Sequence, residues 1–84
     1  MELTQIQKLK FDPDKLKEAR IARFPNLSAN KVATEMLGIH RERLWQYEHG
    51  NQKPSPTMLA RMCALYGVEL RDLTIVEAEL DLAA

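Results

Sequence analysis

The stretch LGIHRERLWQYEHG, residues 37–50, carries the signals of a tight turn followed by a short helix. Gly38 tolerates the positive φ that a break between two helices often needs. Residues 41–49 then provide about two and a half turns of strong helix formers. Gly50 stands where helices commonly stop, and a proline follows four residues later. The stretch therefore predicts a turn between two helices, centred on Gly38.

The helix over 41–49 carries two different faces. Leu44 and Tyr47 are three residues apart and can face inward together with Ile39. The other stripe repeats every fourth residue and has two polar neighbours: Arg41, Trp45 and His49, with Glu42 and Gln46 beside them. Such groups can read a base edge or grip a phosphate, although an ordinary solvated helix face has the same pattern. The flanking segments must decide between these interpretations.

The composition fits one small domain without a membrane segment. Its 84 residues permit one modest core, and 45% of them are hydrophobic and 29% charged. No apolar run approaches the roughly 20 residues of a membrane span, and the N-terminus lacks the basic-then-apolar order of a signal peptide. The single cysteine, Cys63, excludes an internal disulfide and indicates a reducing cytoplasm.

The charges are unevenly distributed although their sum is zero. Residues 1–68 hold 11 Lys or Arg against 7 Asp or Glu, whereas residues 69–84 hold one Arg against five acids. A mildly basic body with an acidic tail can still present a basic face to a partner.

Four more helices are expected around the quoted one. Asp12 and Pro13 are typical of an N-cap and a first helical residue, which predicts a helix ending near residue 23. Ser28 is the expected N-cap of a second helix, and His40 is a weaker cap for the third. Ser55 opens a fourth helix that ends at residue 67, and a short fifth helix is expected to begin near residue 69.

The two ends of the chain leave several structures open. Residues 1–10 are compatible with a short helix, an extended arm or a packed tail. Residues 74–84 could extend the fifth helix, pair with a second chain or fray. Because no clean period-two alternation is visible, the expected fold is all-α with five short helices. The expected division is an N-terminal arm over 1–10, a domain over 11–73 and an acidic tail over 74–84.

The run from Leu16 to Leu73, about 58 of 84 residues, resembles the phage-repressor-like helix-turn-helix family, also called the XRE or Cro/C1-type family. The marks that carry the resemblance are Arg20, Leu27-Ser28, Leu37-Gly38-Ile39, Leu44, Tyr47-Glu48, Gly50, Pro54-Ser55, Leu59 and the run from Leu65 to Leu70. The resemblance implies a compact five-helix, lambda-repressor-like domain whose third helix enters the DNA major groove. From Gly38 to Gly50 the register agrees with the family pattern without a gap.

Matching positions imply that Arg41, Glu42 and Gln46 face base edges. Gln46 could pair with adenine and Arg41 with guanine. Glu42 could accept from cytosine N4, orient Arg41 or repel a wrong register.

Other matching positions imply contacts to the DNA backbone. Asn30, or Ala29 in the other register, falls at the family's phosphate contact beside the Ser28 cap, where helix amides favour an anion. The clamps expected to flank the recognition helix are Arg43, His49, Asn51 and Lys53. Arg20 and Glu48 match a pair of positions that often forms an ion pair between helices 1 and 3.

The chain departs from the family at two places. Eleven residues run from Ser28 to Gly38 where the family usually has ten, so either the turn is longer or the second helix begins elsewhere. Trp45 replaces a small or polar residue. It could contact a thymine methyl group or the sugar-phosphate backbone, cover an exposed patch, or join a protein interface.

These observations predict a DNA-binding transcriptional regulator, a repressor acting as a homodimer on double-stranded DNA at the nucleoid. The alternative is a protein-interaction module of the same fold that does not read DNA, with a partner bound through Trp45 or residues 74–84. An enzyme is not expected, because His40, His49 and Cys63 lack metal-site spacing and no catalytic arrangement or phosphate-binding Gly loop is present. No metal and no cofactor are expected.

Overall fold

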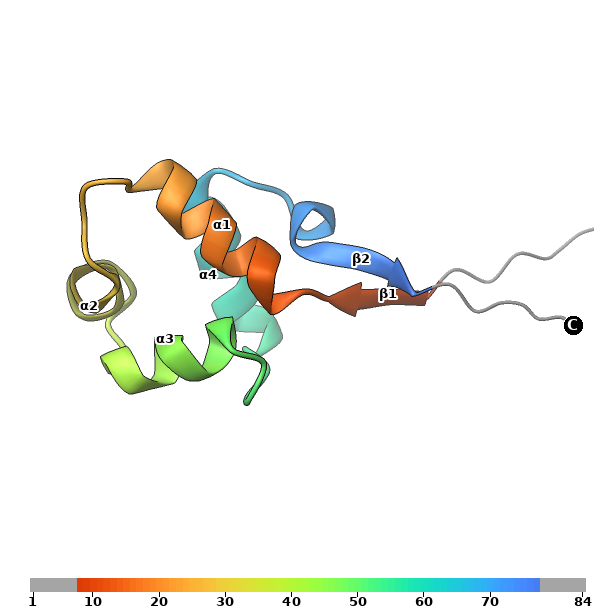
Figure 1. Ribbon diagram of the computed structural model, residues 1–84, viewed down its shortest axis with the longest axis horizontal. Coiled ribbons are helices and arrows are strands. Elements are labelled where there is room, and N and C mark those ends of the chain that lie inside the picture. The colour runs from red at the N-terminus through yellow and green to blue at the C-terminus, as the bar shows by residue number, and fades with distance from the viewer. Residues whose placement is uncertain (1–7, 78–84) are drawn as a thin grey trace, which may run out of the picture.

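The computed structural model describes residues 8–77, which form a helical body with a two-stranded ribbon at one end (Figure 1). The elements in chain order are β1 (Lys8–Phe11), α1 (Pro13–Arg23), α2 (Ala29–Lys31), the π-helix η1 (Val32–Leu37), α3 (Arg41–Glu48), α4 (Pro56–Tyr66), the 3-10 helix η2 (Leu70–Leu73) and β2 (Thr74–Glu77). Since η1 continues α2 without a break, the body contains four helices and a short 3-10 turn.

The starts expected for the first four helices are confirmed. The side chains of Asp12, Ser28 and Ser55 each accept a hydrogen bond from a backbone N–H in the first turn of α1, α2 and α4. His40 caps α3 through its ring, because its Nδ1 accepts from the backbone N–H of Glu42 at 3.1 Å. These caps satisfy amides that the helices leave without partners.

One hydrophobic core joins all the helices. Its buried members are Leu16, Val32, Ala33, Leu37, Leu44, Tyr47, Met62, Tyr66 and Leu73. Three of them come from the α2–η1 helix, and Leu44 and Tyr47 come from α3. The inward face predicted for α3 is therefore confirmed, and packing of this face against the core fixes how α3 presents its other side.

The additional residue between Ser28 and Gly38 is absorbed by the π-helix. Ser28 remains the N-cap and Gly38 ends the helix with φ of 67°, so neither end has moved. Ala33 O accepts from the backbone N–H of Gly38 and, at 2.9 Å, from that of Ile39, which are bonds wider than an α-helical turn. The sequence offered a longer turn or a displaced start as explanations. The structure instead accommodates the residue by widening the helix between them.

We expect deletion of Glu35 to convert η1 into a regular α-helix with a loss below about 1 kcal/mol in the free energy of unfolding. Glu35 is exposed, and its removal changes the spacing of the buried Val32, Ala33 and Leu37 to that of one α-helical face. Urea denaturation followed by circular dichroism measures the loss.

Deletion of the exposed Ala64 in the regular helix α4 is the matched control. That deletion rotates the following residues by roughly 100° around the helix axis and moves Tyr66 away from the core, so it should cost several times more. Equal losses for the two deletions would contradict the role assigned to the π-helix.

The prediction of an all-α fold with five helices was wrong at both ends. β1 and β2 pair antiparallel, with Phe11 opposite Thr74 and Lys10 opposite Ile75. In place of a fifth α-helix, η2 makes one 3-10 turn that begins after Glu69 and leads directly into β2. The remaining parts of the two end segments, residues 1–7 and 78–84, lie outside the described residues.

Pairing of the two strands brings the start of α1 next to the end of η2. The backbone N–H of Asp12 donates to Leu73 O at 2.9 Å, which joins the end of β1 to the end of η2. Figure 1 shows the ribbon leading away from the helical body, on the side opposite α2. The outer side of α3 is consequently left clear of the ribbon.

Candidate nucleic-acid interface

The side of α3 that faces away from the core is polar and exposed. Its exposed side chains are Arg41, Glu42, Arg43 and Trp45, and Gln46 is half-buried. The short turn at Gly38–His40 and the buried Leu44 hold this side in a fixed direction relative to α2. This is the geometry in which a recognition helix projects from the body of a small domain.

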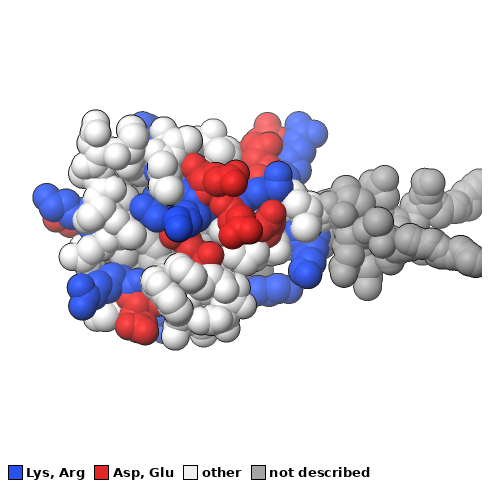
Figure 2. All heavy atoms as spheres, in the orientation of Figure 1, with Lys and Arg blue, Asp and Glu red and all other residues white. Residues whose placement is uncertain are grey.

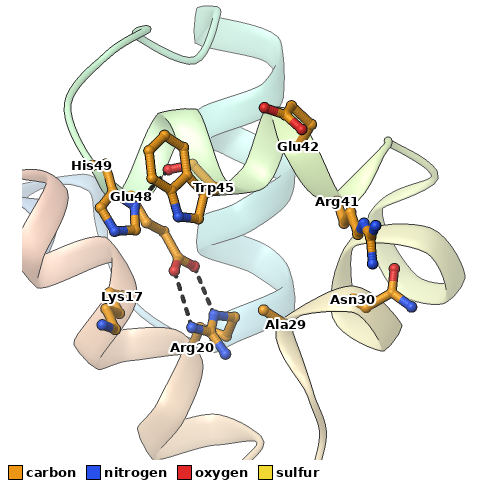
Figure 3. A pocket seen from close by; sticks show the side chains of 9 residues that line it. All are labelled: Lys17, Arg20, Ala29, Asn30, Arg41, Glu42, Trp45, Glu48 and His49. Atoms are coloured by element: carbon orange, nitrogen blue, oxygen red, sulfur yellow. Dashed lines mark hydrogen bonds and ion pairs between the residues drawn. The ribbon is translucent and has the colours of Figure 1, made fainter.

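A shallow depression of about 440 Å³ lies where α1, α2 and α3 meet (Figure 3). Its lining residues are Lys17, Arg20, Ala29, Asn30, Arg41, Glu42, Trp45, Glu48 and His49. Trp45 and His49 form one side of the depression, and Arg41 and Asn30 lie on the other (Figure 3). The depression therefore joins the start of the second helix to the exposed side of the third.

A buried ion pair forms the floor of the depression. Arg20 of α1 donates from Nε to Glu48 Oε2 at 2.6 Å and from an Nη atom to Glu48 Oε1 at 3.0 Å. The two side chains are only 8% and 4% exposed. The hydrogen bonds with Glu48 raise the pKa of the Arg20 guanidinium, although burial opposes them. The pair that the resemblance implied is thus present as a two-bond bridge that fixes α3 against α1.

Tyr66 lies in the core with a hydroxyl group that has no hydrogen-bond partner among the described residues. Burial, together with a smaller contribution from the Glu48 carboxylate, raises the pKa of this phenol, and the Arg20 charge partly offsets the rise. A buried hydroxyl without a partner costs about 1–3 kcal/mol relative to a satisfied one. The unpaired hydroxyl of Tyr66 therefore lowers the stability of the folded protein.

We expect Tyr66→Phe to raise the free energy of unfolding at neutral pH by roughly 1 kcal/mol, because it removes the unsatisfied hydroxyl. The difference should grow above about pH 10, where the tyrosine of the unfolded chain ionises while that of the folded chain stays protonated. There the unfolded state binds fewer protons, so wild-type stability falls by up to about 1.4 kcal/mol per pH unit from this group.

Urea titrations of both proteins from pH 7 to 11 measure this difference. Subtracting one curve from the other cancels the ionisation of the lysines and of Cys63, which the two proteins share. A less stable Tyr66→Phe variant would mean that the hydroxyl has a bound partner.

Trp45 and His49 stack on each other along the exposed side of α3. Their ring centroids are 4.0 Å apart and the planes differ by 17°. Trp45 remains 50% exposed, so the stack covers one face of the indole ring and leaves much of the side chain open to solvent. The pair forms a rigid aromatic edge beside the depression.

The depression brings together some of the predicted site residues and leaves others outside. Those it unites are Arg41, Glu42, Trp45, Ala29, Asn30 and His49. The predicted residues that do not line it are Gln46, Ser28, Arg43, Asn51 and Lys53. The Ser28 hydroxyl accepts from the Lys31 N–H at 3.2 Å as a helix cap. Lys53 instead lines a second depression of about 590 Å³, beside Phe11 and Leu70.

Lys17 is a lining residue that the sequence reasoning missed. It is exposed and lies on α1, three residues before Arg20 and thus on the same side of that helix. The spacing from Arg20 was the signal that could have found it. Lys17 adds a cation from α1 beside His49 (Figure 3).

The face of the molecule drawn in Figure 2 carries charges of both signs. In the view of Figure 2, Lys and Arg side chains alternate with Asp and Glu side chains over the helical body. The cations that the depression itself offers to a polyanion include Lys17 and Arg41, which line it.

Within 8–77, no group of three or more His, Cys, Asp or Glu side chains could hold a metal ion. Burial and the Asp72 carboxylate raise the pKa of the half-buried Cys63, which disfavours its thiolate. Among the same residues, no helix has the length and the apolar character needed to cross a membrane.

The fold and the exposed third helix define a helix-turn-helix domain. A family model described as a helix-turn-helix domain matches residues 14–74, more than half of the chain. The chain therefore belongs to this helix-turn-helix family. The family is XRE-like (Cro/C1-like), as the resemblance in the sequence implied. The family is a DNA-binding and non-enzymatic one, so membership indicates DNA as the partner. Neither the comparison with curated proteins nor that with solved structures found a significant match.

Proposed function

We propose that this protein is a sequence-specific transcriptional regulator that reads the DNA major groove with α3. The observation that carries the proposal is the orientation of this helix. Its apolar side is buried, while Arg41, Glu42 and Trp45 project next to the start of α2. An exposed polar helix beside a helix start is the arrangement that places one helix in the groove and the other on the backbone.

The base-reading residues in this proposal are Arg41, Glu42, Gln46 and Trp45. Arg41 pairs with guanine and Gln46 with adenine, because these side chains match the donors and acceptors of those base edges. Glu42 either accepts from cytosine or orients Arg41. Trp45 offers an apolar surface for a thymine methyl group or a deoxyribose.

The remaining predicted residues hold the DNA backbone. The start of α2, from Ser28 to Asn30, presents helix amides to one phosphate. Arg43, His49, Asn51 and Lys53 contact phosphates beside the recognition helix, and Lys17 joins them from α1. Because Arg43 and Lys53 do not line the depression, their contacts belong to neighbouring parts of the groove wall.

The protein acts in this proposal as a homodimeric repressor on double-stranded DNA in the cytoplasm. A single module binds DNA weakly, and two modules on half-sites one helical turn apart restore the affinity. Residues 1–10 and 74–84 remain the proposed dimer contacts. Within the described residues, parts of these two segments pair with each other as β1 and β2. The molecular mass in solution, with and without residues 78–84, tests this proposal.

The proposed recognition of a specific DNA sequence is tested by selecting DNA from a random pool with the purified full chain. Mobility-shift titration of the selected DNA then measures the affinity. A preferred sequence should emerge at moderate salt. Gln46→Ala should then relax the preference at one base pair, at a cost of about 1–3 kcal/mol against the best site. Lys53→Ala should weaken all sequences alike and reduce the salt slope by about 1. Recovery of no preferred sequence would overturn the proposal.

A protein-interaction module is the second candidate function. The mixed charges in Figure 2 and the half-exposed Trp45 favour it, since tryptophan commonly anchors protein interfaces. A protein partner whose binding survives Arg41→Ala and is lost with Trp45→Ala would support this second function. Loss of DNA binding with Arg41→Ala supports the first.

A further inference from the structure

The Nδ1 atoms of the two histidines, at the start and the end of α3, face backbone groups of opposite kind: an N–H at His40 and a carbonyl oxygen at His49. His49 Nδ1 lies 2.8 Å from the backbone carbonyl oxygen of Trp45, which can only accept a hydrogen bond. His49 must therefore carry its proton on Nδ1 and donate it. His40 Nδ1 accepts from the Glu42 N–H, so neutral His40 carries its proton on Nε2. Both rings are thus held at Nδ1, that of His40 at the start of α3 and that of His49 at its end.

This bond decides what His49 can offer to DNA. With Nδ1–H donated to Trp45 O, the outer nitrogen Nε2 of the exposed neutral ring holds a lone pair. Phosphate oxygens also present lone pairs, so the neutral ring has no proton for them. Once Nε2 is protonated, it becomes a charged donor, and the bond from Nδ1 is retained.

We propose that His49 grips a DNA phosphate only as the imidazolium, so that binding of DNA takes up one proton per protomer at Nε2. This inference rests on the proposed function and adds a regulation to the same surface: DNA affinity rises as pH falls.

The groups around His49 are compatible with the added charge. Trp45 covers one ring face at 4.0 Å, and an indole face attracts cations. His49 also ends α3, and the carbonyl end of a helix carries partial negative charge. The cation that faces it from α1 is Lys17, whereas Arg20 and Glu48 of the floor neutralise each other. Across the depression, α3 contributes one charge of each sign, Arg41 and Glu42.

His40 provides the internal control, because protonation breaks the hydrogen bond of the His40 ring and preserves that of the His49 ring. Protonation of His40 would place a hydrogen on the nitrogen that accepts from Glu42 N–H and would break the cap of α3. Protonation of His49 breaks no bond. Any rise in DNA affinity at low pH should therefore belong to His49 alone.

The tautomers are measured first, in the free full-length protein, by two-bond nitrogen–proton NMR correlation at pH 7.5. The chain has only two histidines, so Gln and Asn variants assign the signals. We expect the Nδ1–H form for His49 and the Nε2–H form for His40. An Nε2–H form of His49 would overturn the inference without touching the proposed function.

DNA affinity is then measured by fluorescence anisotropy from pH 5.5 to 8 at constant ionic strength, using the selected DNA duplex. Wild-type affinity should rise by up to about tenfold per pH unit where one proton is linked. The His40→Asn variant, which keeps a good helix cap, should retain this rise. His49→Gln should lose the rise and bind weakly at every pH, and His49→Lys should bind tightly throughout.

The outcomes separate the inference from the function on which it rests. Binding with the same pH dependence in wild type and His49→Gln overturns the phosphate contact through Nε2 and leaves DNA recognition intact. Absence of DNA binding in all variants, with the NMR tautomers as expected, overturns the proposed function. A salt slope that steepens by about 0.9 from pH 8 to pH 5.5, in wild type but not in His49→Gln, identifies the added contact as a phosphate.

Discussion

Replacing Glu48 by Ala is expected to lower the free energy of unfolding by about 3–5 kcal/mol. The variant leaves the Arg20 guanidinium buried, 8% exposed, without the carboxylate that accepts both of its hydrogen bonds. Small domains have a total stability of about 5–15 kcal/mol. The variant should therefore be partly unfolded at 37 °C, with its urea midpoint shifted far below that of the wild type.

Two further variants separate this pair from an ordinary surface contact. Arg71→Ala removes the exposed ion pair with Glu69, whose side chains are 78% and 70% exposed, and should cost about 0–1 kcal/mol. The double variant Arg20→Met with Glu48→Leu replaces both buried charges by apolar groups and should recover most of the lost stability. A Glu48→Ala loss no larger than that of Arg71→Ala would show that water solvates Arg20.

The ion pair also shows what a resemblance adds to local sequence reasoning. Arg20 and Glu48 are 28 positions apart, and neither belongs to a hydrophobic pattern that would bring them together. Composition and periodicity assign both to solvated faces, since charged residues are rarely buried. The expected pairing came only from the family positions that these two residues occupy.

Local signals were sufficient for the helices. A cap at Asp12, Ser28 or Ser55 is decided by a side chain and an amide two or three residues away, which a sequence displays directly. The inward side of α3 followed from the spacing of Leu44 and Tyr47 for the same reason. These features depend on contacts within one helical turn or on one repeated period.

The strands and the π-helix depend on relations that are not local. Lys10 pairs with Ile75, and each strand has only four residues, which is too short for alternation to be seen. The π-helix was visible only as one surplus residue before Gly38. Whether that residue widens the helix or the turn is decided by burial of Val32, Ala33 and Leu37 in one core. The sequence of residues 28–38 alone does not predict this packing.

The depression is predictable only in part, because three helices build it. The α3 residues Arg41, Trp45 and His49 follow from one stripe of the sequence. Lys17 comes from a helix whose rotation about its own axis is fixed by Leu16 in the core and by Arg20 on Glu48. Conversely, Lys53 follows the recognition helix closely in sequence, yet the loop directs it to the second depression. Proximity along the chain therefore does not tell which residues line the same depression.

Leu44→Ala is expected to lower the free energy of unfolding by about 2–5 kcal/mol, because Leu44 is fully buried and its truncation leaves a cavity between α3 and the core. Urea denaturation measures this loss. The folded fraction of the variant should keep the DNA affinity of the wild type, since Leu44 makes no contribution to the exposed side of α3. Affinity is compared at a temperature where both proteins are folded.

Trp45→Ala, one residue along the same helix, should have the opposite effects: it should hardly change stability and should weaken DNA binding. Half of the Trp45 side chain is exposed, so its loss should change the free energy of unfolding by less than about 1 kcal/mol. Loss of the aromatic edge beside the depression should reduce DNA affinity by roughly tenfold, which corresponds to about 1.4 kcal/mol. Because the two positions are adjacent, any general effect of mutating α3 would appear in both variants. Opposite effects on stability and affinity can arise only if the two sides of α3 have different tasks. If Trp45→Ala instead destabilises the fold as much as Leu44→Ala, its indole ring belongs to the structure of the domain, and the remaining readers of α3 must provide recognition without it.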